Sequence, residues 1–461
     1  MKIGFLAMSG IRAHDPELLE LGLTLPGFVE RSRQIAALPS LGLLWLAART
    51  PPSHELRYLE AESDRSEPAE VYDCDLVAIS TFSAQAFEAY AIADRLRAAG
   101  VLVAIGGLHA TACPAEAARH ADYVVVGEGE MVWPHIVAHA EAAGAAGGRS
   151  RTARRLDARD FPRVDVAALP VPRYDLLGER PYNRFTVQTS RGCPWRCDFC
   201  ASTVMLRERY RKRPIDHVVR DVRAVLELHP HAFIELADDN TFVDKAWGRE
   251  LCRALAPLGI RWFTETDVSV ADDPELLDLL AEAGCRQLLI GLESPDRASL
   301  EGLETRANFK ARRAGRYREA IHAIQSRGVT VNGCFILGLD HHGPEVFGDV
   351  ARFSRELELY DVQVTVLTAF PGTPLHERLL RERRIIEPGR WDLCTLFDVN
   401  HRPARMSPEE LRAGLRWLMK ELYCESATRA RRAGFFERRR ERDRSPASRT
   451  APGALAAAPT A

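Results

Sequence analysis

Three things are scarce in this sequence of 461 residues: cysteine, net charge and long apolar runs. Ten cysteines are too few for a disulfide scaffold at this length and suit a reducing compartment. The net charge of -2 creates no field that would draw nucleic acid, so we expect no nucleic-acid partner. No run approaches the roughly 18–20 apolar residues of a membrane span, and the first residues lack the long apolar region of a signal peptide. We therefore expect a cytoplasmic protein without a transmembrane segment.

The cysteine that is present concentrates in one stretch, where Cys193, Cys197 and Cys200 stand in C-x3-C-x2-C spacing. Three thiolates in one tight loop can hold three irons of a 4Fe-4S cluster and leave the fourth iron open to a substrate or cofactor. Residues 183–190 are rich in β-formers and predict the strand that delivers the loop. A zinc site normally shows a second spaced pair of ligands, which does not follow here. Incidental structural cysteines are the remaining alternative.

Residues 1–143 alternate apolar strand-like runs with helix-like segments, which predicts a doubly wound, Rossmann-like parallel sheet. The expected strands are 2–8, 54–60, 75–80, 101–105 and 121–126. Glycines follow the last two strands, at 106–107 and 127–129. Such glycines at the carboxyl ends of parallel strands let a large ligand approach the backbone, although plain tight turns would also use them.

The rest of the chain divides into four parts. Residues 144–182 combine glycines, arginines and prolines and predict a linker. Residues 183–390 show six strand–helix units, fewer than a closed eightfold barrel, and thus predict a partial (β/α)6 barrel. Residues 391–434 predict a helical segment, whose main helix begins at Ser407. Residues 435–461 are charged and then low in complexity, which predicts a disordered, solvated tail.

The cysteine loop resembles that of the radical S-adenosylmethionine (radical SAM) superfamily, which places an aromatic residue, here Phe199, before the third cysteine. Residues 105–111 and 122–130, with 39–44, resemble the cobalamin-binding domain joined to one branch of that superfamily. The D-x-H-x-x-G string that supplies a lower cobalt ligand in other cobalamin domains is missing. His14 and His109 are interpreted as loop histidines rather than cobalt ligands.

The resemblance implies a set of binding residues and no protein residue in a catalytic role. Phe199 and Asp238, Asp239 and Asn240, near the methionine amino group, would contact S-adenosylmethionine. Glu293 and Ser294 would contact its ribose, and Gly333, Ile336 and Gly338 its adenine. The residues expected beside cobalamin are Ser80, Thr81, Gly106, Gly107, His109, Gly127, Glu128 and Gly129.

These implications give one leading hypothesis and two alternatives. The leading hypothesis is a class B-like methyltransferase that forms a 5′-deoxyadenosyl radical and, with cobalamin, methylates an unactivated carbon of a small-molecule substrate. Lipids such as hopanoids, tetrapyrroles and natural products are the implied substrate classes. An electron donor such as flavodoxin or ferredoxin would reduce the cluster. The alternatives are a cobalamin radical SAM cyclase or rearrangement enzyme without methyl transfer, and a non-catalytic cobalamin or cluster sensor.

Overall fold

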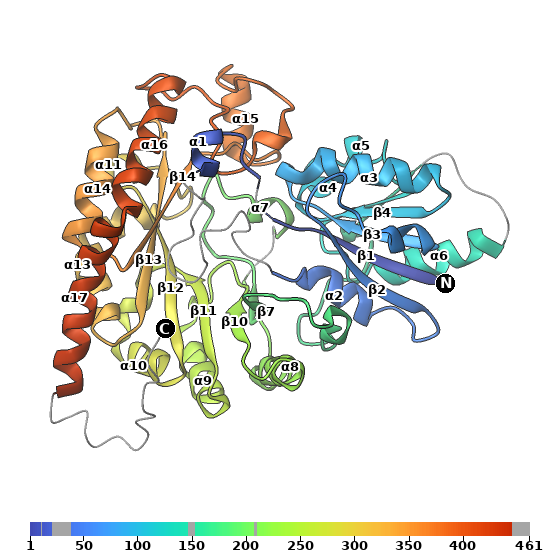
Figure 1. Cartoon of the computed structure of the whole chain (residues 1–461), viewed down its shortest axis with the longest axis horizontal. Coiled ribbons are helices and arrows are strands. Elements are labelled where there is room, and N and C mark those ends of the chain that lie inside the picture. The colour runs from blue at the N-terminus through green and yellow to red at the C-terminus, as the bar shows by residue number, and fades with distance from the viewer. Residues whose placement is uncertain (11, 21–37, 146–152, 207–209, 445–461) are drawn as a thin grey trace.

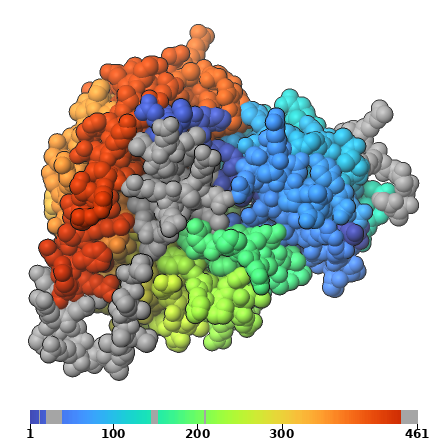
Figure 2. Space-filling model, in the orientation of Figure 1, coloured from blue at the N-terminus to red at the C-terminus, as the bar shows by residue number. Residues whose placement is uncertain are grey.

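Two parallel six-stranded sheets form the protein, and they lie side by side in the computed structural model (Figure 1). The model describes the chain except residues 11, 21–37, 146–152, 207–209 and 445–461. The space-filling view shows the two bodies meeting along a junction, with the green segment that follows the first sheet lying at it (Figure 2). This arrangement confirms the predicted α/β fold class: a doubly wound domain, a partial barrel and carboxyl-terminal helices.

The first sheet has the strand order β2-β1-β3-β4-β5-β6, and all of its pairs are parallel. Its strands are β1 (Lys2–Met8), β2 (Glu55–Ala61), β3 (Leu76–Ser80), β4 (Leu102–Gly106), β5 (Tyr123–Val126) and β6 (Arg154–Asp157). Helices cover both faces, because buried apolar residues of α2 (Leu41–Ala48) and α6 (Trp133–Ala145) belong to one core and those of α3 (Ala86–Ala98) to another. Three shorter helices complete this part: α1 (Pro16–Glu20), α4 (Leu108–Ala112) and α5 (Pro114–Ala117).

The expected linker, residues 144–182, contributes more structure than a spacer would. Its strand β6 pairs with β5 and extends the first sheet by one edge strand. Further along, the Tyr174 hydroxyl donates to the Thr186 carbonyl at 2.8 Å, and the Pro170 carbonyl accepts from Trp45 Nε1 at 3.1 Å. The segment therefore packs against both bodies.

The second sheet has the order β14-β13-β12-β11-β10-β7, and its two edge strands do not pair with each other, so the barrel is open. Its strands are β7 (Phe185–Val187), β10 (Phe233–Leu236), β11 (Arg261–Thr266), β12 (Cys285–Glu293), β13 (Thr330–Leu337) and β14 (Asp361–Val366). The main covering helices are α8 (Ile215–Leu228), α9 (Lys245–Leu255), α10 (Pro274–Glu282), α13 (Tyr317–Gln325) and α14 (Val346–Glu356). Shorter elements are β8 (Ser190–Arg191), β9 (Arg211–Lys212), α7 (Ser202–Met205), α11 (Arg297–Leu300), α12 (Phe309–Arg313) and α15 (Pro374–Arg381). The six predicted units are confirmed.

The carboxyl-terminal part consists of α16 (Pro408–Tyr423) and α17 (Glu425–Arg444), which run along the outer side of the barrel (Figure 1). Ser407 caps α16 in a capping box with Glu410, as the sequence predicts. The expected disorder does not hold for residues 435–444, which continue α17, and Phe435 is buried. Residues 445–461 lie outside the described part of the chain. No helix in the described ranges is both long and apolar enough to cross a membrane.

Candidate active site at the junction of the two sheets

The cysteine loop lies at the carboxyl end of the barrel's first strand. Gly192 adopts a left-handed conformation (φ 84°), which turns the chain into the loop, and its N–H donates to Asp239 Oδ2 at 3.0 Å. Cys193, Cys197 and Cys200 are partly buried and form no disulfide. Asn240 Nδ2 lies 3.9 Å from Cys193 Sγ. Three thiols on one braced loop are the donor set of a 4Fe-4S cluster with one open iron.

The polar residues that follow β10 support the cysteine loop. Asp238 Oδ1 accepts from the N–H groups of Thr189 and Ser190 at 2.8 and 2.9 Å. Its Oδ2 accepts from the hydroxyls of Thr189 and Thr241. These four donors fill the acceptor positions of a carboxylate, and Asp238 is buried. Asp238 therefore holds the loop in place and has no acceptor left for the methionine amino group that the resemblance assigns to it.

Asn240 sits in a second network under the loop. Its Nδ2 donates to Asp267 Oδ2 at 2.8 Å, and the same oxygen accepts from Trp195 Nε1 at 2.9 Å. The Trp195 ring stacks on Phe309, with centroids 4.1 Å apart. Residues 192–195, at the start of the loop, are thus fastened to the segments that follow β10 and β11.

Glu293 occupies a distorted end of β12. The pairing register with β13 shifts between Gly291 and Glu293, and Glu293 has a φ of 63°, which is strained for a residue with a side chain. Its carboxylate pairs with Lys310 Nζ at 2.5 Å, and Lys310 also donates to the Gly291 carbonyl. The adjacent Ser294 is fully buried and contacts His342 Nε2 at 3.0 Å. Glu293 and Ser294 therefore have separate partners, Lys310 and His342, at the distorted end of β12.

The expected adenine residues fall into two kinds. Phe199 and Ile336 pack around one small apolar core at the ends of β13 and β14. The open sides of the glycines, in contrast, are filled by protein: a Cβ on Gly333 would meet Leu359 at 2.8 Å, and one on Gly338 would meet Leu411 at 2.8 Å. Phe199 and Ile336 thus remain candidates for an apolar ligand face, whereas the two glycines serve internal packing.

Acidic side chains line the concave side of the barrel below the loop. Arg184 pairs with Glu235 of β10 at 3.0 Å and lies over the Phe263 ring of β11 at 5.2 Å. Because side chains alternate along a strand, Glu265 shares the face of Phe263. Glu265 is accessible within this concavity. The surrounding protein, together with Glu235 and Asp239, raises the pKa of Glu265 to about 8.

The carboxyl edge of the first sheet provides a second binding face. Strand order reverses between β1 and β3, and ligands of doubly wound sheets bind at such a switch point. Phe82, directly after Thr81 at the end of β3, is 64% exposed although it is a large apolar ring. Gly107 (φ 94°) lies so close to the end of β3 that a Cβ would meet the Thr81 carbonyl oxygen at 2.9 Å. An edge stripped of side chains beside an exposed ring fits a large flat ligand such as cobalamin.

The other residues expected beside cobalamin differ in what they offer. Gly106 pairs with Ser80 in the sheet. The Gly127 N–H donates to Thr111 Oγ1 at 3.0 Å and is therefore not available to a ligand. Gly129 approaches Leu46. The Glu128 side chain points to arginines of the barrel rather than across the edge.

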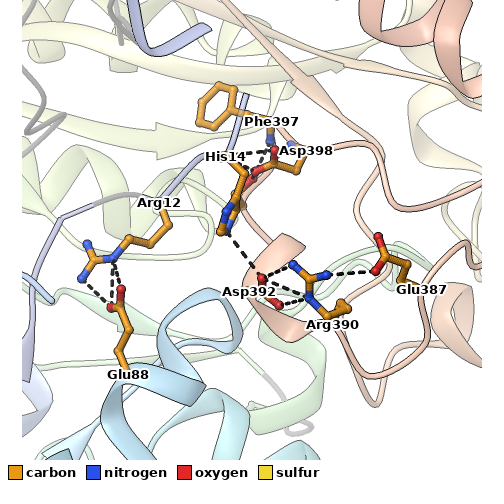
Figure 3. Close-up of polar contacts among 9 residues, drawn as sticks. Arg12, His14, Glu88, Glu387, Arg390, Asp392, Phe397 and Asp398 are labelled. Carbon is orange, nitrogen blue, oxygen red and sulfur yellow. Dashed lines mark hydrogen bonds and ion pairs between the residues drawn. The ribbon is translucent and has the colours of Figure 1, made fainter. Parts of the chain in front are cut away.

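Neither interpreted histidine faces this edge with a free ring nitrogen. His109 is fully buried, with Nδ1 3.1 Å from Ser83 Oγ and Nε2 3.3 Å from Glu116 Oε1. The His14 ring lies toward Asp392 at 3.6 Å, and its backbone N–H donates to Asp398 (Figure 3). His14 lies in a loop, as expected, whereas the expectation of a surface or loop position is wrong for His109, which is fully buried on α4.

Two arginines, Arg191 and Arg211, join the two binding faces. Arg191, two positions before Cys193, reaches across the junction and pairs with Glu128 Oε1 at 2.6 Å and with Glu130 Oε1 at 2.8 Å. Arg191, Phe82, Glu265 and Lys310 are not singled out by the sequence motifs. The one usable signal was position: Arg191 adjoins the cysteine loop, and Phe82 adjoins the expected cobalamin residues.

Comparison with known proteins agrees with this division of the chain. Residues 187–354 match the radical SAM superfamily, and residues 36–137 match the B12 binding domain. An uncharacterized methyltransferase of Synechocystis is 30% identical over 375 residues, which cover 80% of this chain and 68% of that protein. The bacteriochlorophyllide d C-12(1)-methyltransferase of Chlorobaculum tepidum is 25% identical over 86% of this chain and 84% of its own. The radical S-adenosylmethionine methyltransferase TsrM from Kitasatospora setae has the same fold, with a TM-score of 0.61 and 18% identity over 83% of this chain and 76% of that one.

Proposed function

The chain belongs to the cobalamin-dependent radical SAM methyltransferases, and on that premise we propose which residues carry its reaction and what kind of substrate it takes. The family uses a 4Fe-4S cluster, S-adenosylmethionine and cobalamin. When bound, the cluster supplies the electron that opens S-adenosylmethionine to a 5′-deoxyadenosyl radical, and cobalamin supplies the methyl group. The observation that carries the proposal is the placement of the cysteine loop directly against the carboxyl edge of the first sheet, joined to it by Arg191.

Cys193, Cys197 and Cys200 hold the cluster, and the bracing of their loop is the work of Asp238, Asp239 and Asn240. Phe199 and Ile336 offer the apolar face for adenine, and Glu293 the acceptor for ribose. The edge from Thr81 to Gly107, with Phe82, receives cobalamin. The domain boundaries follow the same logic, with residues 144–182 as a structured connection between the two cofactor-binding bodies. A flavodoxin or ferredoxin in the cytoplasm supplies the electron.

The substrate offers polar groups that can hydrogen-bond with carboxyl side chains. Glu235 and Glu265 face the concavity in which a substrate would meet the radical, and only Arg184 balances them among the described residues that face it. A saturated hydrocarbon would leave these groups without partners, at a cost of about 1–3 kcal/mol each. A tetrapyrrole, as in the name of the Chlorobaculum relative, or a polar natural product satisfies them better than a hopanoid does.

Replacement of Cys197 by alanine tests the assignment. With one of three ligands removed, we expect Cys197→Ala to lose the brown cluster absorption and all 5′-deoxyadenosine formation under anaerobic, reducing conditions. The exposed Cys424 lies outside the loop, so Cys424→Ala is the matched control and should retain both. Full deoxyadenosine formation by Cys197→Ala would refute the cluster assignment. Turnover with methyl-labelled S-adenosylmethionine then separates methyl transfer from cyclisation, because only the former leaves label in the product.

A further inference from the structure

The junction between the cysteine loop and the first sheet is built around one guanidinium group. Arg191 NH1 pairs with Glu128 Oε1 at 2.6 Å, NH2 pairs with Glu130 Oε1 at 2.8 Å, and Nε donates to Gln188 Oε1 at 3.0 Å. The face of the group lies over the Trp45 ring, 5.2 Å from its centroid. All three edges of Arg191 and one face are therefore engaged, and the side chain is 6% exposed. We call Arg191, Glu128 and Glu130 the junction cluster.

The members of the junction cluster come from the start of the cysteine loop and from the carboxyl edge of the first sheet. Arg191 ends β8, and the loop of cysteines begins two residues later. Glu128 and Glu130 flank Gly129 in the turn between β5 and α6, at the carboxyl edge that offers the cobalamin face. Arg211 of β9 pairs with Glu128 Oε1 at 2.8 Å, so two cations meet two carboxylates. Burial alone would raise the pKa of Glu128, but Arg191 and Arg211 hold it below its ordinary value, so the pairs stay charged.

Such a cluster is a poor device for stability alone. Taking charges out of water costs about as much as their attraction returns, and well-packed apolar side chains would hold two bodies together at least as well. Ion pairs with a planar guanidinium differ from apolar contacts in that they have direction: two carboxylates must approach in the plane of the fork. The junction cluster therefore restricts how far apart, and at what angle, the loop and the turn can lie.

We propose that the junction cluster is a positioning device. It holds the cysteine loop and the carboxyl edge of the first sheet at the separation needed for methyl transfer between their cofactors. Arg191 is its central positioning residue. The proposal rests on the proposed function. Deoxyadenosine formation would require only S-adenosylmethionine and one electron from the reduced iron–sulfur cluster. Methyl transfer would break the sulfur–methyl bond of S-adenosylmethionine, form a cobalt–methyl bond with the electron pair of reduced cob(I)alamin and release S-adenosylhomocysteine, so it requires both faces in register. Loss of the junction cluster should uncouple the second process from the first.

The experiment compares both products in one reaction. The full-length protein, loaded with cluster and cobalamin, is mixed with S-adenosylmethionine and titanium(III) citrate as reductant, without substrate. The initial rates of 5′-deoxyadenosine and of S-adenosylhomocysteine are measured, the latter up to one equivalent of cobalamin. For Arg191→Met we expect the 5′-deoxyadenosine rate to stay within about twofold of wild type and the S-adenosylhomocysteine rate to fall at least tenfold. Glu130→Gln removes the charge of one carboxylate but keeps an acceptor oxygen, and it leaves the Arg191–Glu128 pair, so we expect a smaller loss of about threefold to tenfold.

A spectroscopic readout accompanies the rates. Dipolar coupling between the unpaired spins of cob(II)alamin and the reduced cluster reports their separation by pulsed electron paramagnetic resonance. We expect one narrow distance distribution in wild type and a broad one in Arg191→Met at equal cofactor loading. Arg253→Met is the control, because Arg253 belongs to an exposed pair with Glu275 on the barrel surface, and it should match wild type in rates and distance.

Each result decides something. An unchanged product ratio and an unchanged distance in both variants would overturn the proposal. So would a parallel loss of both products, which would make the junction cluster a purely structural contact. If Arg191→Met does not fold or load, Glu130→Gln carries the test by the same two readouts. If the wild type itself forms neither product, the proposed function fails, which is distinguishable from failure of the positioning role.

Discussion

Asp238 offers the sharpest test of how the cysteine loop is supported. In Asp238→Ala the buried N–H groups of Thr189 and Ser190 lose their acceptor, at about 1–3 kcal/mol each, and a small cavity forms. We expect the free energy of unfolding to fall by about 3–5 kcal/mol, a large share of the roughly 5–15 kcal/mol of a domain. In Asp238→Asn one oxygen still accepts both N–H groups, and the hydroxyls of Thr189 and Thr241 can rotate to accept from the amide. Burial raises the pKa of Asp238, so a neutral amide is tolerable there, and we expect a loss of only about 1 kcal/mol.

Urea unfolding of the iron-free protein, followed by circular dichroism and tryptophan fluorescence, measures both variants. Asp278→Ala is the control, because Asp278 carries only an exposed pair with Arg327, and it should change stability by less than about 1 kcal/mol. The Asp238→Asn variant should keep the KM for S-adenosylmethionine. The reasoning fails if Asp238→Ala unfolds like wild type, or if Asp238→Asn keeps its stability but raises that KM at least tenfold, which would make Asp238 a contact of the methionine amino group.

Three further outcomes follow from ionisable side chains of the barrel. Lys310→Met leaves Glu293 buried without its partner, so we expect a loss of about 3–5 kcal/mol in urea unfolding, largely restored in Lys310→Arg; equal losses in both would contradict the ion-pair account. The folded protein raises the pKa of Glu265 from its ordinary 4.5 to about 8, so the free energy of unfolding falls as pH rises from about 4.5 to 8. The melting temperature of Glu265→Gln should depend less steeply on pH in that window than the melting temperature of wild type. Parallel curves of melting temperature against pH would contradict this. Arg432→Met should cost about 3 kcal/mol, because the fully buried Asp361 keeps only Gln287 as a donor, and an unchanged urea midpoint would show that α17 does not dock.

The parts of the fold that the sequence predicts are those with a strong period or punctuation. The buried strand from Leu76 to Ser80 is predictable from its apolar run, and the helix after Ser407 is predictable from its cap residues. The edge strand Arg154–Asp157 does not, because it pairs on one side only and its four residues are largely polar. Residues 435–444 look like a solvated tail by composition, yet Phe435 and paired arginines of α17 dock on the barrel.

The same limit applies to the site. The three cysteines and Phe199 are identifiable from spacing, since one loop carries them all. The cluster of Arg191 with Glu128 and Glu130 is not, because its members are separated by about sixty residues and meet only through the packing of two sheets. Asp238 has the right position in the motif, but its role depends on four donors that no local pattern reveals.

The contacts of the segment around His14 have a consequence for how the protein is made. Asp15 pairs with Arg416 at 2.7 Å, and the His14 N–H donates to Asp398, so residues separated by about four hundred positions hold this segment in place. The first sheet ends at Asp157, so about 260 further residues must be made before Arg416 exists, which takes roughly 13–50 seconds at synthesis rates of about 5–20 residues per second. During that interval the strands of the first sheet are complete, while the segment around His14 lacks its carboxyl-terminal partners. The segment around His14 can therefore be fastened only after α16 has emerged, so its final placement is among the last steps of folding.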